Sequence, residues 1–211
     1  MRERGYLQGD QPFRWSRTVL VGEREIAVEI DLLAPVTPRT PCAHRHERVG
    51  GEPLARRTEG AEPVREAAVE RALVGLLPDG RHHQARVRVA APAAFIVLKA
   101  LAMGSRDKPK DAYDIDYVLR HLDVDEVAAD IRAFGDVRSV RTARAILADR
   151  FASVGGLGSQ GVALYRRLPL GSAEADQAQA QAFARVRTAA GPHRHLITRR
   201  PRGRHRAIHP S

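Results

Sequence analysis

The sequence predicts an α+β protein in which a small mixed β-sheet packs with helices and the C-terminal half is helical. Three observations support this prediction. Alternation of apolar and polar residues is confined to the first 90 residues, helical spacing dominates after Pro92, and an Arg- and His-rich segment ends the chain. We therefore expect a partial sheet region at 1–90, a helical part at 91–187 and a disordered basic tail at 188–211.

The first predicted element is a β-hairpin over 18–33, with its turn at "GERE". Its second strand alternates, which predicts one face that points to the core and an opposite face that carries Asp31 near the end of the strand. The residues of the predicted core face are Ile26, Val28, Ile30 and Leu32.

A Pro-, Gly- and Arg-rich segment, 34–61, predicts a long loop, in which His44 and His46 are solvated because no carboxylate or cysteine set surrounds them. The next segment predicts an amphipathic helix that begins at Glu62 and ends at Pro78. Its apolar positions are Val64, Ala68, Ala72 and Leu76. A short strand is predicted at 86–90.

Helical patterns fill the rest of the chain up to its basic end. Pro92 at a first turn and Gly104 at an end are typical of helix termini. The predicted helices cover 92–104, 111–122, 124–134, 138–152 and 173–187, with a Gly-rich turn and a short helix within 153–165. The glycines of "GGLGSQG" match neither a Walker nor a dinucleotide-binding motif, so we interpret them as a loop.

Composition excludes several classes of protein. No apolar run approaches the ~20 residues of a membrane span, and the first residues contain no apolar signal region. One cysteine, Cys42, excludes an internal disulfide and a cysteine-based zinc site. We expect a cytoplasmic protein without a membrane partner.

The formal net charge of +10 is concentrated at the C-terminal end. No acidic residue follows Asp176, and eight arginines lie between Phe183 and Ser211, so the rest of the chain is close to neutral. Two interpretations stay open: an arm that binds RNA or DNA, and an extension without function.

Only three of the 35 basic Lys and Arg residues are lysines, and all three lie within twelve positions: Lys99, Lys108 and Lys110. Lys99 has apolar neighbours in sequence, so its ammonium needs a polar cavity or a partner. On the next helix Asp111 and Asp114 share a face. One interpretation is a salt-bridged helix pair in which Lys99 or Arg106 binds these carboxylates. The other is a cationic pocket for triphosphate, because lysine is a compact phosphate ligand.

The stretch "LKALAMGSRDKPKDAYDID" resembles the C-terminal signature of the AbiEii/AbiGii-type nucleotidyltransferase toxins. The matching residues are Lys99, Ala102, Arg106, Lys110, Asp111, Tyr113 and Asp114. The strand "VEIDLLAP" is similar to a core strand of that family, with Asp31 at the position of a carboxylate beside the metal. The resemblance covers about residues 5–187.

The resemblance implies a toxin of a type IV toxin–antitoxin system that transfers a nucleotidyl group from a nucleoside triphosphate to an acceptor. It implies Mg²⁺ as cofactor, held by Asp31, and catalytic roles for Asp31, Lys99 and Asp111. Lys99, Arg106 and Lys110 are the implied nucleotide-binding residues, and Asp114 supports them. It also implies a cognate antitoxin as partner.

One departure from the family pattern is the missing D-x-D pair, which in the family precedes this core strand. The "DID" string at 114–116 lies in a predicted helix, where its two aspartates point about 200° apart. We therefore expect an N-terminally truncated member that is inactive on its own. The alternative is a non-catalytic module that binds an antitoxin or nucleic acid. The catalytic interpretation requires Asp31 and Lys99 to share one pocket.

Overall fold

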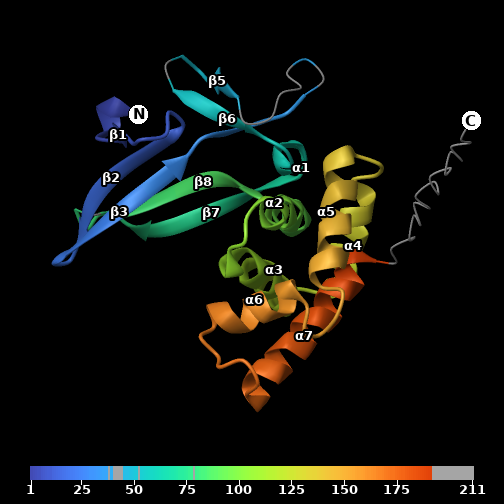
Figure 1. The fold of residues 1–211 in the computed structure, drawn as a ribbon. Coiled ribbons are helices and arrows are strands. Elements are labelled where there is room, and N and C mark those ends of the chain that lie inside the picture. Colours follow the sequence, from blue (N-terminus) through green and yellow to red (C-terminus); the bar gives the residue numbers. More distant parts are fainter. Residues whose placement is uncertain (38, 40–44, 52, 78, 192–211) are drawn as a thin grey trace, which may run out of the picture.

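A computed structural model describes residues 1–37, 39, 45–51, 53–77 and 79–191. After a 3₁₀ turn, η1 (Arg2–Arg4), the strands are β1 (Leu7–Gln8), β2 (Arg14–Val21), β3 (Arg24–Asp31), β4 (Leu33–Pro35), β5 (His46–Arg48), β6 (Leu54–Thr58), β7 (Ala68–Leu76) and β8 (His82–Ala90). The helices are α1 (Ala61–Glu66), α2 (Pro92–Ser105), α3 (Pro109–His121), α4 (Val124–Ala133), α5 (Arg138–Arg150), α6 (Leu157–Tyr165) and α7 (Ala173–Ala190). The predicted α+β class and the helical C-terminal half are confirmed (Figure 1).

The predicted N-terminal hairpin is present as β2 and β3, which pair antiparallel from Arg14 with Asp31 to Val21 with Arg24. Gly22 has φ of 62°, a left-handed conformation that glycine adopts without a Cβ clash. β1 adds a short third strand on the free side of β2. The register places Arg14 directly opposite Asp31.

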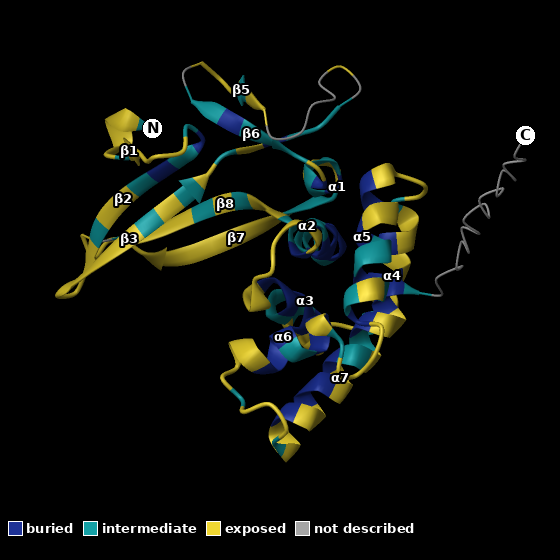
Figure 2. Cartoon of the chain, in the orientation of Figure 1, coloured by how far each residue is buried: buried dark blue, intermediate teal, exposed yellow. Residues whose placement is uncertain are grey.

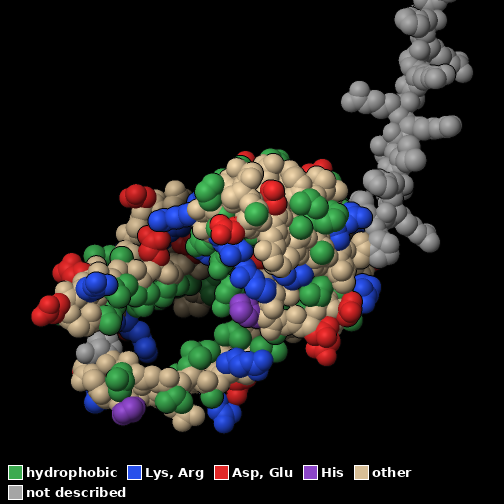
Figure 3. Space-filling model, turned by 90° about the horizontal axis from the view of Figure 1, so that it is seen from below, with side chains coloured by type: hydrophobic (Ala, Val, Ile, Leu, Met, Phe, Trp, Pro, Cys, Tyr) green, Lys and Arg blue, Asp and Glu red, His purple; other side chains and the backbone are tan. Residues whose placement is uncertain are grey.

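The predicted core face of β3 is only weakly buried. Val28, Ile30 and Leu32 are half-buried, and Ile26 is 44% exposed. Alternation identifies which side of a strand is apolar, but burial also requires a layer that covers it. The β2–β3 hairpin and the hairpin of β7 and β8 extend away from the helices, and Figure 2 shows both largely exposed. Figure 3 shows hydrophobic side chains along an opening between the two hairpins.

The prediction of a long loop over 34–61 is wrong, because β4, β6 and β5 form a second small sheet in this order. β4 runs parallel to β6, and β5 runs antiparallel to it. Strands of three to five residues are too short to leave an apolar period in a composition rich in Pro, Gly and Arg. His46 stacks on Phe13 with ring centroids 5.7 Å apart, whereas His44 lies outside the described residues.

The prediction of a helix from Glu62 to Pro78 is also wrong. Helix α1 ends at Glu66, and the segment continues as β7, which pairs with β8 from Ala68 opposite Ala90 to Leu76 opposite His82. The predicted apolar positions were spaced four residues apart, and a spacing of four places residues on one face of a strand as well as a helix. The predicted strand at 86–90 is part of β8.

The predicted helices after Pro92 are confirmed to within a few residues. Helix α7 continues to Ala190, so the prediction that the tail begins at 188 is wrong for its first three residues. An Ala-rich sequence favours this continuation. The residues from 192 onward lie outside the described part of the chain.

The hydrophobic core lies between the helices. Its largest fully buried apolar side chains are Phe151, Ile96, Ile115, Leu119, Ile131 and Leu147. Within the described ranges, no helix is long and apolar enough to cross a membrane.

Candidate functional site

The Lys99 ammonium joins α2 to α3 through two carboxylates. Its Nζ lies 2.6 Å from Asp114 Oδ2 and 3.2 Å from Asp111 Oδ1. A lysine among apolar neighbours requires such partners, because burial of an unpaired charge is unfavourable. Asp111 and Asp114 lie on the same face of α3, as their spacing predicted. The salt-bridged helix pair is therefore confirmed.

Arg106 fixes the connector between α2 and α3. Its guanidinium donates from Nε to Asp111 Oδ2 at 2.7 Å and from Nη2 to Asp111 Oδ1 at 2.8 Å. Asp111 is only 1% exposed. Its burial by itself raises the pKa of the carboxyl, but the hydrogen bonds from Arg106 and Lys99 outweigh that effect and hold the pKa below 3.8. Asp111 thus stays ionised and orients both cations.

Lys110 donates to both oxygens of Asp114 at 2.8 Å. This hydrogen bond raises the pKa of Lys110 above its ordinary value. Lys99, Arg106 and Lys110 together oppose the two carboxylates, which leaves one positive charge in excess. Asp116 points away, as predicted, and binds Arg120 and Arg185 instead.

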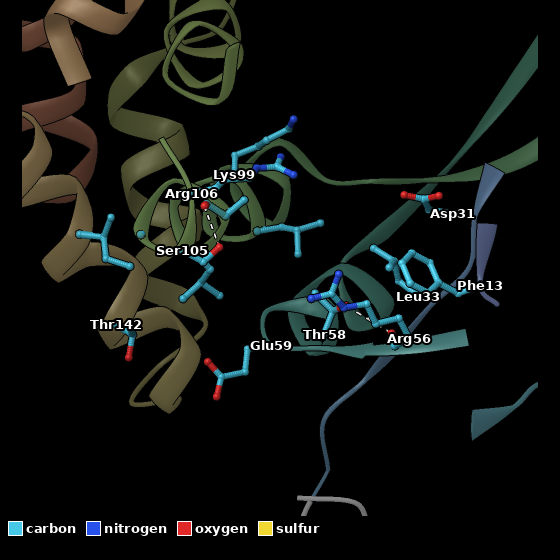
Figure 4. A pocket seen from close by; sticks show the side chains of 15 residues that line it. Phe13, Asp31, Leu33, Arg56, Thr58, Glu59, Lys99, Ser105, Arg106 and Thr142 are labelled. Atoms are coloured by element: carbon cyan, nitrogen blue, oxygen red, sulfur yellow. Dashed lines mark hydrogen bonds between the residues drawn. The ribbon is translucent and has the colours of Figure 1, made fainter. Parts of the chain in front are cut away.

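A cavity of about 500 Å³ lies between the strand region and α2. The residues that line it are Phe13, Asp31, Leu33, Arg56, Thr58, Glu59, Leu98, Lys99, Leu101, Ala102, Gly104, Ser105, Arg106, Thr142 and Ile146. Asp31, Lys99 and Arg106 therefore share one cavity (Figure 4). The predicted ligands Lys110 and Asp114 do not line it, and neither does Asp111.

Asp31 lies at the end of β3, opposite Lys99 and Arg106 across the cavity in Figure 4. Its Oδ1 accepts a hydrogen bond from Arg14 Nε at 2.7 Å, and its Oδ2 accepts one from Arg14 Nη2 at 2.9 Å. This bidentate hydrogen bond lowers the pKa of Asp31 below 3.8. Asp31 is therefore a weak base at neutral pH.

The oxygen donors of the cavity do not fit a resident magnesium ion. Mg²⁺ requires a near-octahedral set of oxygen ligands. Within the part of the chain that is described, Asp31 and Glu59 are the carboxylates that line the cavity, and Arg14 occupies both oxygens of Asp31. No group of three His, Cys, Asp or Glu residues in that part could hold a metal ion. The Mg²⁺ prediction therefore has no support from the donor set.

Five polar residues of the cavity were not predicted: Arg56 and Thr58 of β6, Glu59, Ser105 of α2, and Thr142 of α5. Arg56 also lies over the Phe13 ring, 5.5 Å from its centroid. β6 is part of the segment interpreted as a loop, so no strand pattern indicated which of its side chains share a face. Thr142 is one polar residue on a helix, and no pattern distinguishes it.

A comparison with protein families gives one match, over residues 58–202, to the family described as "Nucleotidyl transferase AbiEii toxin, Type IV TA system". The chain belongs to this family. No curated protein and no solved structure gives a significant match.

The match to the AbiEii family includes the whole lysine-containing stretch and the α2 wall of the cavity. Asp31 lies before the matched range. Membership makes the protein a nucleotidyltransferase-like toxin of a type IV toxin–antitoxin system, and such a system implies a cognate antitoxin.

Proposed function

We propose that this AbiEii-family protein binds the triphosphate of a nucleoside triphosphate in the cavity between β3, β6 and α2. The observation that carries the proposal is that Asp31 and Lys99, 68 positions apart in the chain, line the same cavity. Its volume of about 500 Å³ lies within the range of small-molecule sites.

The charges on the α2 wall suit phosphate oxygens. Lys99 and Arg106 line the cavity, and ion pairs hold their charged groups: Asp111 and Asp114 bind Lys99, and Asp111 binds Arg106. Arg106 offers a planar fork of donors and Lys99 a compact charge, and both kinds of group bind phosphate. The ion pairs keep these donors in place before a ligand arrives, which reduces the cost of ordering them.

Nucleotidyl transfer is the reaction that the family implies. An acceptor hydroxyl oxygen bonds to the α-phosphorus, the bond from that phosphorus to the bridging oxygen breaks, and pyrophosphate leaves with the electron pair. The hydroxyl proton passes to solvent water. The lowered pKa of Asp31 makes it a poor base at neutral pH, so we assign it to positioning of the acceptor or nucleotide.

The same geometry also favours a second function, that of a non-catalytic module that binds a partner. The described residues offer no group that fits a metal ion, and Asp31 is held by Arg14. Such a module would bind an antitoxin or nucleic acid, and it would transfer no nucleotidyl group from any nucleoside triphosphate that it binds. Binding and transfer therefore have to be measured separately.

The test is isothermal titration with ATP and with GTP, each with and without Mg²⁺. Lys99→Met should weaken binding roughly tenfold, because it removes a charge-assisted hydrogen bond. Lys110→Met is the matched control: it also removes an ion pair to Asp114, but Lys110 does not line the cavity. No heat with either nucleotide, or an equal loss in the two variants, would contradict the proposal.

Transfer is then measured with α-³²P-labelled nucleotides and total cell RNA and protein as acceptors. If the wild type incorporates label and Lys99→Met does not, the protein is a nucleotidyltransferase. Binding without incorporation supports the non-catalytic module.

A further inference from the structure

Three of the four tyrosines of the chain gather on one surface formed by α3 and α6. The ring of Tyr113 lies 4.5 Å from Tyr165 and 6.0 Å from Tyr117, measured between centroids, and Tyr117 lies 4.5 Å from the ring of His121. Tyr117 is 48% exposed and Tyr165 is 42% exposed. In a chain with 5% aromatic residues, this exposed aromatic group needs a physical reason.

Glycines of α6 let this helix pack closely on its neighbours, and Gly161 brings it close to α3. A Cβ added at Gly161 of α6 would lie 3.2 Å from the Ala112 Cβ of α3, and one added at Gly158 would lie within 2.7 Å of three atoms of the Phe151 ring. The interpretation of the "GGLGSQG" glycines as a loop is therefore wrong from Leu157 onward, because Gly158 and Gly161 lie in α6 and permit its close packing. That packing sets Tyr165 against Tyr113.

Basic residues adjoin the rings, one in space and two in sequence. The three carboxylates of α3, Asp111, Asp114 and Asp116, are all neutralised by ion pairs. The Lys110 Nζ lies 5.9 Å from the centroid of the Tyr165 ring. Arg166 and Arg167 follow Tyr165 directly, and both are exposed. An anionic ligand with planar groups would therefore find both kinds of contact here.

Arg167 adopts a backbone conformation that normally selects glycine. Its φ is 57°, and the structure shows this at no other non-glycine residue among those it describes. The N–H of Leu168 donates to the carbonyl of Ala163, and the N–H of Arg167 to that of Leu164, which is the pattern of a glycine-terminated helix end. A non-glycine residue in this conformation is strained, which makes the Arg167 side chain a candidate for a functional contact.

We propose that the surface of Tyr113, Tyr117, Tyr165, Arg166 and Arg167, the tyrosine surface, binds single-stranded nucleic acid. Bases stack on the exposed rings, and the two arginines contact the phosphates. A single strand is favoured over a duplex because only unpaired bases offer their faces to aromatic side chains. The proposal does not depend on nucleotide binding in the cavity.

The test is fluorescence anisotropy with a labelled single-stranded RNA of about 12 nucleotides, a length that spans such a site. Tyr117→Leu and Tyr165→Leu should each weaken binding roughly tenfold, because they remove a stacking platform. Tyr117→Phe and Tyr165→Phe keep the ring and should bind as the wild type does. Tyr6→Leu, which changes the one tyrosine outside the cluster, is the control and should have no effect.

Arg167→Gly separates binding from folding. Glycine relieves the strain at φ 57°, so the melting temperature should stay equal or rise. Affinity for the RNA should fall, and the slope of log K against log salt should decrease by about one unit. A merely structural arginine would give no loss of affinity.

Three results would overturn the proposal: Leu variants that bind like wild type, equal binding of a duplex of the same length, or full competition by an abasic strand. The last result would assign binding to charge alone, such as the charge of the Arg-rich sequence after residue 191.

Discussion

Asp116 on α3 and Arg185 on α7 form a buried ion pair across 69 positions of sequence. Asp116 Oδ1 accepts from Arg185 Nε at 3.0 Å and from Nη2 at 2.7 Å, while Oδ2 accepts from Arg120 at 2.9 Å. This pair fastens the last helix to the centre of the bundle.

Loss of this pair should destabilise the fold strongly. Arg185→Leu leaves the buried Asp116 carboxylate with one cation fewer, which should lower the free energy of unfolding by about 3 kcal/mol. Chemical denaturation measures the effect. The control is Arg187→Leu on the same helix, where the arginine is exposed and the expected change is small. Equal effects of both changes would show that the pair is not important.

Stability should fall in acid in a way that depends on Asp111. The pKa of this carboxyl is held below 3.8 in the fold, so its contribution is present above 3.8 and is lost as the pH falls through the lower, folded value. Asp111→Asn should lower stability at neutral pH and reduce the additional loss in acid. Denaturant unfolding of both proteins at a series of pH values checks this, and parallel curves would contradict it.

Arg14 should control the titration of Asp31. Arg14→Leu removes the hydrogen bonds that lower the pKa of this carboxyl, so the pKa should rise toward 3.8. Carboxyl ¹³C chemical shifts followed against pH measure it. Arg17→Leu on the same strand, whose guanidinium donates to the carbonyl of Arg4, is the control and should leave Asp31 unchanged.

Gly158 should tolerate no side chain. In Gly158→Ala the new Cβ lies 2.5 Å from the buried Phe151 ring, which would have to shift at a cost of about 1–3 kcal/mol. Gly155→Ala is the matched control, because nothing lies within 4 Å of a Cβ at that position. Thermal denaturation of the two variants compares them, and equal melting temperatures would show that the ring moves freely.

The helical half of the fold could be predicted from the sequence because its helices are long and bear clear terminal signals. Pro92 begins α2 as predicted, whereas the predicted start of α3 at 111 missed Pro109 at its first turn. The strand half could be predicted only for β2, β3 and part of β8. The error at β7 arose because its apolar spacing fits both a helix and a strand, and β4 to β6 are too short to show a period.

The contacts of the candidate site could also be predicted only in part. The pairing of Lys99 with Asp111 and Asp114 follows from helical spacing, and the shared cavity with Asp31 was expected from family resemblance. The pairing of Arg14 with Asp31 depends on the register of β2 against β3. The predicted turn did not determine this register to within several residues. Arg56, Glu59 and Thr142 are brought to the cavity by tertiary packing alone.

The concentration of buried apolar residues in α2–α7 has an evolutionary consequence. Since the hairpins contribute few of the side chains that stabilise the bundle, folding should constrain most of their residues less than it constrains those of the helices. Related chains should therefore diverge fastest at the exposed positions of β2, β3, β7 and β8, whereas the helical bundle and the cavity residues Asp31, Lys99 and Arg106 should change least.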